Sequence, residues 1–191
     1  MVSEKGIPPA QRLLDAAVLL FYAEGIHAVG VERLIAEAGV TKATFYRHYR
    51  SKDDLVVAYL AHKDTTTRAA LLGATADLEP QQALPALFAA IAAYSCGPGF
   101  RGCPFINAAS EYPDRTHPVR QAVTAHRTWL RTTLSGLLTA LDHPEPESTA
   151  RQLVYLRDGI LMAGYLDSPD AVDATARHAL RGIIGEHTVH N

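Results

Sequence analysis

Apolar residues recur at helical spacing through most of the chain, and no segment alternates apolar and polar positions in the way a strand does. Glycine and proline interrupt these stripes at intervals, so the pattern resolves into about nine helices. The predicted helices occupy residues 9–24, 31–38, 41–49, 52–72, 80–95, 104–112, 118–141, 147–166 and 170–186. We therefore expect an all-α fold.

The two short helices at 31–49 carry the most specific pattern. Gly39 lies between them, where a chain leaving a helix commonly turns left-handed, and Thr41 can cap the second helix by accepting a backbone N–H. A short cationic helix after a glycine turn suits the DNA major groove, with flanking cations and hydroxyl groups on phosphates. The pattern predicts a DNA-binding helix-turn-helix, and the alternative is a helical hairpin whose basic face is only solvated. The charged side chains from 41 to 52 are all basic: Lys42, Arg47, Arg50 and Lys52.

The segment GIHAVGVERLIAEAGVTKATFYRHYRSKDDLV, residues 25–56, resembles the N-terminal domain of the TetR (tetracycline-repressor) family of bacterial transcription regulators. The matching motifs cover roughly residues 10–60. Two positions depart from the family pattern: Gly30 stands where Ser or Thr is usual, and Ile35 stands where Ala is usual. The resemblance is carried by Gly25 before the motif, Ala38-Gly39-Val40 at the turn, Phe45-Tyr46-x-His48-Tyr49, and Ser51-Lys52.

This resemblance implies a ligand-responsive transcription regulator, usually a repressor that a small organic effector releases from a palindromic operator, and not an enzyme. Within the motif, Lys42, Thr44 and Tyr46 are expected at base edges or adjacent phosphates. Thr41, His48, Tyr49 and Lys52 are expected mainly at the DNA backbone. The predicted DNA-binding residues are Thr41, Lys42, Thr44, Tyr46, Arg47, His48, Tyr49 and Lys52.

We expect a three-helix DNA-binding domain at 1–51 and a ligand-binding and dimerisation domain at 52–191, with helix 52–72 connecting the two. In the last two helices apolar residues cover more than one narrow face, as expected of helices that pack both inward and against a partner. The resemblance implies that these helices of two protomers form a four-helix dimer interface. Such a dimer places its two DNA-binding domains, the reading heads, on a two-fold symmetric operator. We expect Arg157 and Asp158 either to pair across this dimer or to lie at its solvated edge.

The middle helices supply the effector pocket in this family, so aromatic residues and a buried amide there are the candidates for contact with an organic ligand. For each candidate, an ordinary core position is the alternative. The segment Gly102-Cys103-Pro-Phe-Ile-Asn107 also resembles a TetR subgroup with a Gly-Cys-x-x-x-Asn signature. The predicted ligand-binding residues are Tyr94, Phe105, Asn107, Trp129, Tyr155 and Tyr165, with Phe88 and Met162 as weaker candidates.

Composition limits the other possibilities. The formal net charge of −2 means that contact with DNA depends on a local basic patch. No apolar run approaches the roughly 20 residues of a membrane span, and the N-terminus lacks the apolar core of a signal peptide, so the cytoplasm is the expected location. No paired metal-ligand motif or phosphate-binding loop occurs, and we expect no metal and no cofactor. His187 and His190 near the end are interpreted as solvated residues.

The two cysteines, Cys96 and Cys103, leave two rival hypotheses open. In the first, the regulator senses oxidants by joining the two thiols, although Arg101 is the only basic residue close in sequence that would favour a thiolate. In the second, an α-helical enzyme uses Cys103 with His117 or His126. No nucleophile or oxyanion signature accompanies these residues, which argues against the enzyme.

Overall fold

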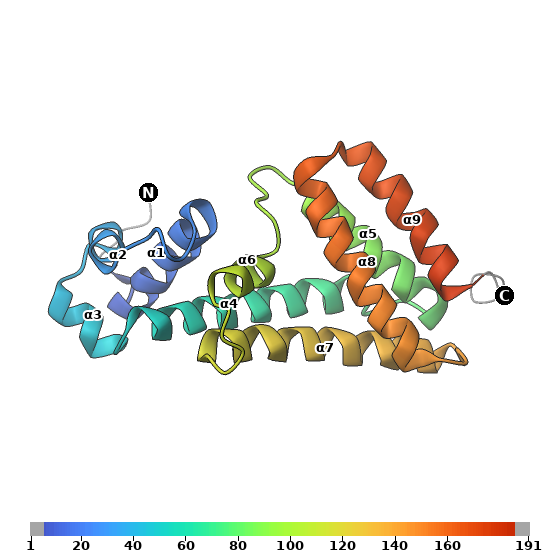
Figure 1. The fold of residues 1–191 in the computed structure, drawn as a ribbon, viewed down its shortest axis with the longest axis horizontal. Coiled ribbons are helices and arrows are strands. Elements are labelled where there is room, and N and C mark those ends of the chain that lie inside the picture. Colours follow the sequence, from blue (N-terminus) through green and yellow to red (C-terminus); the bar gives the residue numbers. More distant parts are fainter. Residues whose placement is uncertain (1–5, 186–191) are drawn as a thin grey trace. The chain divides into compact units, whose positions relative to one another are not determined.

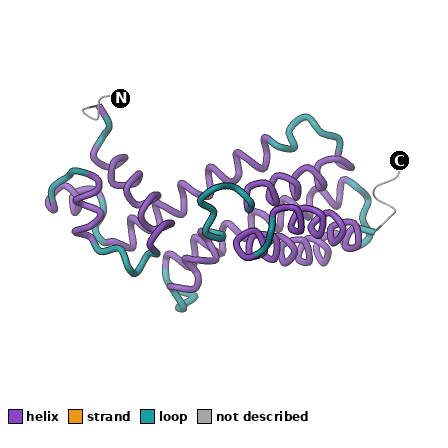
Figure 2. Tube along the Cα trace, turned by 90° about the horizontal axis from the view of Figure 1, so that it is seen from above, coloured by secondary structure: helices purple, strands orange, loops and turns teal. Residues whose placement is uncertain are grey.

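The computed structural model describes residues 6–185, and within that range every regular element is a helix (Figure 2). Figure 1 labels the nine helices assigned to these residues in chain order. They are α1 (Pro9–Glu24), α2 (Val31–Ala38), α3 (Lys42–His48), α4 (Lys52–Gly73), α5 (Pro80–Ser95), α6 (Pro104–Glu111), α7 (Pro118–Ala140), α8 (Pro146–Leu166) and α9 (Pro169–Ile184). The predicted all-α fold is confirmed. The tail histidines, His187 and His190, lie outside the described residues.

Proline opens six of the nine described helices, namely α1, α5, α6, α7, α8 and α9. The proline ring holds φ near the helical value, and the N–H that proline lacks would have no partner in the first turn of a helix. The positions of these prolines therefore largely predict where the six helices begin. Pro85 is different, because it lies inside α5 beyond the first turn, and α5 nevertheless continues to Ser95.

Two compact units divide the described chain. The first comprises the residues up to 64 together with 104–123, and the second comprises 65–103 together with the residues from 124 onward. The helices α4 and α7 each contribute one part to either unit, and α6 belongs to the first. The predicted boundary between residues 51 and 52 separates DNA binding from ligand binding and dimerisation, whereas the two units are defined by packing. The predicted boundary therefore stays a prediction.

The first unit is built around the buried face of α1. Leu13, Ala17 and Leu20 on that face are at most 2% exposed, and α1 packs against both α2 and α3. Phe21, further along the same face, meets the Tyr59 ring of α4 edge-on at a centroid distance of 5.7 Å. The apolar face of α1 thus gives α2 and α3, with 8 and 7 residues, the tertiary support that such short helices need.

In the second unit, α5 packs against α8 and α9, and α8 packs against α9. The contact faces are aliphatic and buried, with Leu84 on α5, Leu153 on α8 and Leu180 on α9. The helices α8 and α5 approach closely at Gly164, where an added Cβ would overlap the Ser95 side chain, 2.4 Å from its Oγ atom. Only a residue without a side chain allows α8 to lie so near the end of α5.

We predict that Gly164→Ala lowers the free energy of unfolding by about 1–3 kcal/mol, because the added methyl group overlaps Ser95 and forces α8 away from α5. Urea unfolding measures the difference. Gly136→Ala in α7 is the matched control: no atom lies within 4 Å of its added Cβ, so it should raise stability by up to about 1 kcal/mol through helix propensity alone. Equal unfolding free energies for the two variants would contradict the close contact at Gly164.

Candidate nucleic-acid interface

The turn between α2 and α3 is fixed by hydrogen bonds to the backbone. Gly39 follows α2 with φ 60° and ψ 39°, the left-handed conformation predicted for it, and its N–H donates to the carbonyls of Ile35 and Ala36. The Arg12 guanidinium of α1 donates to the Gly39 carbonyl at 3.2 Å. Because this turn is held both by α2 and by α1, the direction in which α3 leaves it is set.

Thr41 caps α3, as predicted. Its backbone is extended, and its Oγ1 atom accepts the Thr44 N–H at 3.2 Å. The hydroxyl groups of Thr41 and Thr44 also lie 2.9 Å apart and share a hydrogen bond. Gly30 precedes α2 and offers no side-chain cap, so α2 begins without the hydroxyl that stabilises the start of α3.

A single residue anchors α3, and most of the rest of the helix faces solvent. Phe45 is 0% exposed, and its ring lies edge-on to the Tyr46 ring at 5.2 Å. The Tyr49 hydroxyl donates to the Ala10 carbonyl of α1 at 3.5 Å, and burial raises the pKa of this phenol, which keeps it protonated. The exposed members of the predicted DNA-binding set are Thr41, Lys42, Tyr46, Arg47 and His48, while Thr44, Tyr49 and Lys52 are half-buried.

The basic side chains of this surface differ in their partners. The Lys42 Nζ atom lies 2.7 Å from the Glu32 carboxylate of α2, whose hydrogen bond and charge raise the pKa of Lys42. Burial lowers the pKa of Lys52 at the start of α4. Arg47 and Arg50 have no acidic partner within residues 6–185. Sequence reasoning missed Glu32, because the segment from 41 to 52 contains no acid and Glu32 comes from the preceding helix.

The six predicted ligand-binding residues fall in both units. Phe105 and Asn107 lie on α6 of the first unit, where Phe105 is buried and Asn107 is half-buried. Trp129 is half-buried on α7, with the Arg68 guanidinium 4.6 Å from its ring centroid. Ligand contact by any of the six stays a prediction. The three tyrosines of the set, all exposed, are Tyr94, Tyr155 and Tyr165.

The helix α8 presents an apolar stripe to solvent. Tyr155, Met162 and Leu166 are 63%, 50% and 69% exposed, and their spacing places them on one face of the helix. Beside the stripe, a groove of about 400 Å³ runs between α8 and α9 and is lined by Gly159 and Ala163. Exposed apolar side chains gathered on one face of a helix are typical of contact with another molecule.

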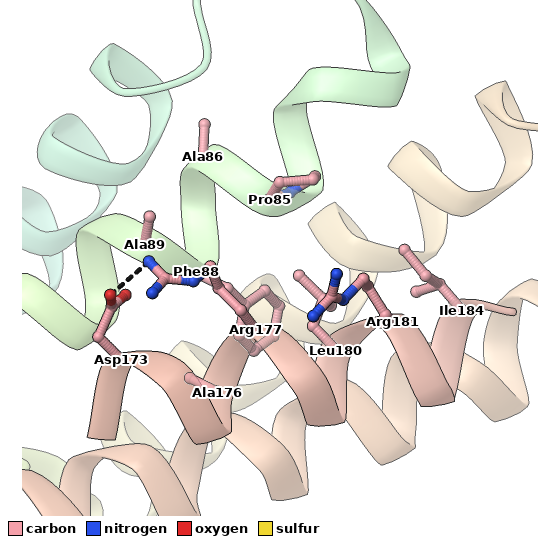
Figure 3. Close-up of a pocket in the computed structure, with 10 residues that line it drawn as sticks. All are labelled: Pro85, Ala86, Phe88, Ala89, Asp173, Ala176, Arg177, Leu180, Arg181 and Ile184. Carbon is pink, nitrogen blue, oxygen red and sulfur yellow. Dashed lines mark ion pairs between the residues drawn. The ribbon is translucent and has the colours of Figure 1, made fainter. Parts of the chain in front are cut away.

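A second groove of about 400 Å³ runs between α5 and α9 (Figure 3). The buried side chains of Phe88 and Leu180 line it, together with the exposed Arg177, which forms an ion pair with Asp173 of the same helix. Sequence reasoning missed this groove, because alanines and leucines at helical spacing read the same whether a neighbouring helix covers them fully or in part.

A polar network surrounds Cys103 in the second unit. The Cys103 thiol is 2% exposed, and the Arg157 guanidinium donates to its sulfur at 3.3 Å. Arg157 also donates to Asp158 at 2.9 Å, and Asp158 pairs with Arg127 of α7 at 2.7 Å. Burial alone would lower the pKa of Arg157, but the neighbouring Cys103 and Asp158 hold it above its ordinary value.

This network corrects two predictions. Arg157 is only 6% exposed and pairs within its own protomer, so neither pairing across a dimer nor a solvated edge describes it. Arg101 is not the only basic residue near Cys103, because the Arg157 guanidinium contacts the sulfur from 54 positions further along the chain.

The described residues form neither a metal site nor a membrane span. No group of three or more His, Cys, Asp or Glu side chains is arranged to hold a metal ion. No described helix combines the length and the apolar character needed to cross a membrane.

An all-α chain in which a capped, anchored second helix exposes cationic side chains defines a DNA-binding regulator of the helix-turn-helix class. Comparison with known proteins narrows the class. Residues 13–59 match the family described as "Bacterial regulatory proteins, tetR family", and residues 80–180 match "Tetracyclin repressor-like, C-terminal domain". The chain belongs to the TetR family, as its resemblance predicted. Regulators of this family are transcription factors rather than enzymes; they bind operator DNA and small-molecule effectors and act as dimers.

Individual relatives agree with this assignment. The chain is similar to SCO4454, a TetR-family transcriptional regulator from Streptomyces coelicolor, at 42% identity and a TM-score of 0.88, covering 95% of this chain and 97% of that one. A putative TetR regulator from Streptomyces avermitilis is 26% identical with a TM-score of 0.81, covering 91% and 98%. The regulator SrpR of Pseudomonas putida is 34% identical over 53 residues, which is 28% of this chain and 25% of SrpR.

Proposed function

We propose that this chain is a homodimeric repressor that leaves a two-fold symmetric operator when a small organic effector binds. The proposal that the protein reads DNA rests on the surface of α3. Phe45 anchors this helix, and the exposed side chains that remain are mostly cationic or hydroxyl-bearing. Such side chains suit phosphates and base edges. A repressor of bacterial genes acts where the chromosome lies, so its place of action is the cytoplasm.

Position along α3 supports a division of labour among the predicted DNA-binding residues. We assign Lys42, Thr44 and Tyr46, near the start of the helix, to base edges or adjacent phosphates. The remaining members contact the DNA backbone. The Thr44 hydroxyl shares a hydrogen bond with the Thr41 hydroxyl in the free protein. On binding, we expect the Thr44 hydroxyl to replace this bond with one to DNA. The members assigned to the backbone are Thr41, Arg47, His48, Tyr49 and Lys52.

We predict that Lys42→Ala lowers operator affinity about tenfold and flattens the slope of log K against log salt by about 0.9, the effect of one phosphate contact. Glu32→Gln is the matched variant: it releases Lys42 from its ion pair and should raise the affinity. Fluorescence anisotropy over a range of salt concentrations, with an operator selected from random duplex DNA, measures both quantities. An unchanged salt slope in Lys42→Ala would remove Lys42 from the phosphate contacts.

The apolar stripe on α8 supports dimerisation through α8 and α9. Two-fold symmetry brings the same surface of two copies together, so Tyr155, Met162 and Leu166 of each protomer would cover those of the other. The adjoining groove between α8 and α9, lined by small residues such as Gly159, leaves room for a side chain of the partner. Tyr155 therefore has a role at the dimer interface as well as its predicted role toward the effector.

We predict that Met162→Asp raises the dimer dissociation constant at least about 100-fold, because symmetry places two unpaired carboxylates in an apolar interface. Thr132→Asp, an exposed position on α7, adds the same charge and should leave the dimer intact. Sedimentation equilibrium on the two variants measures the dissociation constants. A dimer that tolerates Met162→Asp would place the interface elsewhere.

The effector works through differential binding. An organic molecule that fits the ligand-binding domain better in one arrangement of the heads than in another shifts the dimer toward that arrangement. A coupling of about 1–3 kcal/mol loosens operator binding 5- to 150-fold, and operator DNA weakens effector binding by the same factor. Tyr94, Phe105, Asn107, Trp129 and Tyr165 remain our candidates for effector contact. Membership of the subgroup with the Gly-Cys-x-x-x-Asn signature is part of this proposal.

The contact between Cys103 and Arg157 favours a second candidate function, in which oxidation of Cys103 releases the operator. The Arg157 guanidinium places a cationic donor 3.3 Å from the sulfur, the atom that an oxidant would attack. The thiolate attacks hydrogen peroxide, so that an S–O bond forms, the O–O bond breaks and hydroxide leaves. Attack of the Cys96 thiol on the resulting sulfenic acid would close a disulfide and release water.

For this second candidate we predict that peroxide lowers the operator affinity of the wild-type protein and that Cys103→Ser abolishes the response. Cys96→Ser is the matched variant: a retained response would mean that the sulfenic acid suffices, and a lost response would mean that the disulfide is needed. Anisotropy titrations before and after peroxide treatment measure the change. A wild-type protein that keeps its affinity after peroxide treatment would exclude oxidant sensing.

A further inference from the structure

The last residue of α6, Glu111, holds the turn through which the chain enters the helix-turn-helix. One carboxylate oxygen of Glu111 accepts the Ile26 N–H at 2.9 Å, and the other accepts the His27 N–H at 2.5 Å. The His27 imidazole lies 3.2 Å from the same carboxylate. Gly25, with φ +94°, begins this turn, and an added Cβ there would lie 3.7 Å from Glu111.

The residue after Glu111 holds the place where the chain leaves the motif. The Tyr112 hydroxyl donates to the Asp53 carboxylate, near the start of α4, at 2.7 Å. His117 pairs with the other Asp53 oxygen at 3.3 Å. Burial and the Asp53 hydrogen bond raise the pKa of Tyr112, so its phenol stays protonated as a donor. The His27 and Tyr112 rings stack at 5.0 Å and join the two contacts.

The helix that carries Glu111 is itself firmly placed within the first unit. Phe105 and Ala108, on its apolar face, are at most 2% exposed. The Arg120 guanidinium of α7 donates to the carbonyls of Ala109 and Tyr112, which closes the end of α6. Because its backbone is fixed at this end, the Glu111 carboxylate meets the two N–H groups from a defined position.

We infer that Glu111 is a positioning residue for DNA reading: it sets the pose of α2 and α3 without contacting DNA. Three residues separate His27 from the start of α2, so a change at its N–H is passed to the motif over a short length of chain. Hydrogen bonds to a carboxylate are the stronger kind and are directional, which suits them to fix an orientation. This inference rests on the proposed reading of DNA by α3.

The test compares full-length Glu111→Gln, Glu111→Asp and the control Glu147→Gln, an exposed acid of α8. Glutamine offers one acceptor and places an NH₂ group opposite the second N–H, so it breaks one of the two bonds. Aspartate keeps the charge but is one methylene shorter and cannot reach both N–H groups. The control removes one negative charge from the protein without touching the turn. Affinity is measured for an operator selected from random duplex DNA with the wild-type protein, and for unselected DNA, at several salt concentrations.

We expect Glu111→Gln and Glu111→Asp to lose operator affinity by about tenfold, the factor for one hydrogen bond of ordinary strength, with the salt slope unchanged. The affinity of both variants for unselected DNA should equal that of the Glu147→Gln control. Hydrogen exchange at the Ile26 and His27 amides should be faster than in the wild type. Tyr112→Phe, which breaks only the Asp53 bond, should show a smaller loss in the same direction, and it serves as the test if the Glu111 variants do not fold.

Two outcomes would overturn the inference. If the Glu111 variants exchange faster at these amides yet bind the operator as the control does, the carboxylate only stabilises the turn. If affinity falls equally for the operator and for unselected DNA, Glu111 does not act by positioning. The same holds if the Glu111 variants do not fold and Tyr112→Phe binds the operator like the wild type. A wild-type protein that selects no sequence from the library would refute DNA reading itself, and the inference with it.

Discussion

The burial of Phe45 beneath α3 is the contact on which the proposed reading of DNA depends. A helix of 7 residues is far shorter than the roughly 12–15 that persist alone in water. Burying one phenylalanine side chain contributes about 1.5–3 kcal/mol, and the Thr41 cap adds about 1 kcal/mol. Phe45 and Thr41 hold the helix, and most of its other side chains face solvent. The surface that we propose for DNA contact can therefore consist mainly of charged and hydroxyl groups.

The parts of the fold that the sequence predicts well are those decided within about one helical turn. Gly39 and Thr41 act on atoms three or four residues away, and the structure gives both the conformations predicted for them. The proline-led helix starts are equally local. Helical periodicity predicted the all-α class because each of its repeats relates residues only three or four positions apart. Conformational preferences of this range act before any tertiary contact forms, so residue order is sufficient to read them.

The contacts that the sequence did not predict join residues far apart in the chain. Cys103 meets Arg157 across 54 positions, and Ile26 meets Glu111 across 85. None of these residues, taken alone, indicates its partner in the fold. Their pairing depends on how helices pack, and helix packing depends on the shapes of many apolar side chains at once. The short-range helix-turn-helix motif was thus predictable, whereas the polar contacts of Glu111 and of the Cys103 thiol were not.

The first unit combines two kinds of contact that respond differently to a small displacement. Apolar packing, such as that of α1 against α2 and α3, is not directional, and it keeps most of its stabilising effect when a helix shifts slightly. Hydrogen bonds such as those of Glu111 weaken steeply with distance and angle. Under the inference drawn for Glu111, a small movement of α6 would weaken these hydrogen bonds before it disturbed the apolar core of the first unit. A regulator built in this way can change its affinity for DNA without unfolding the domain that reads it.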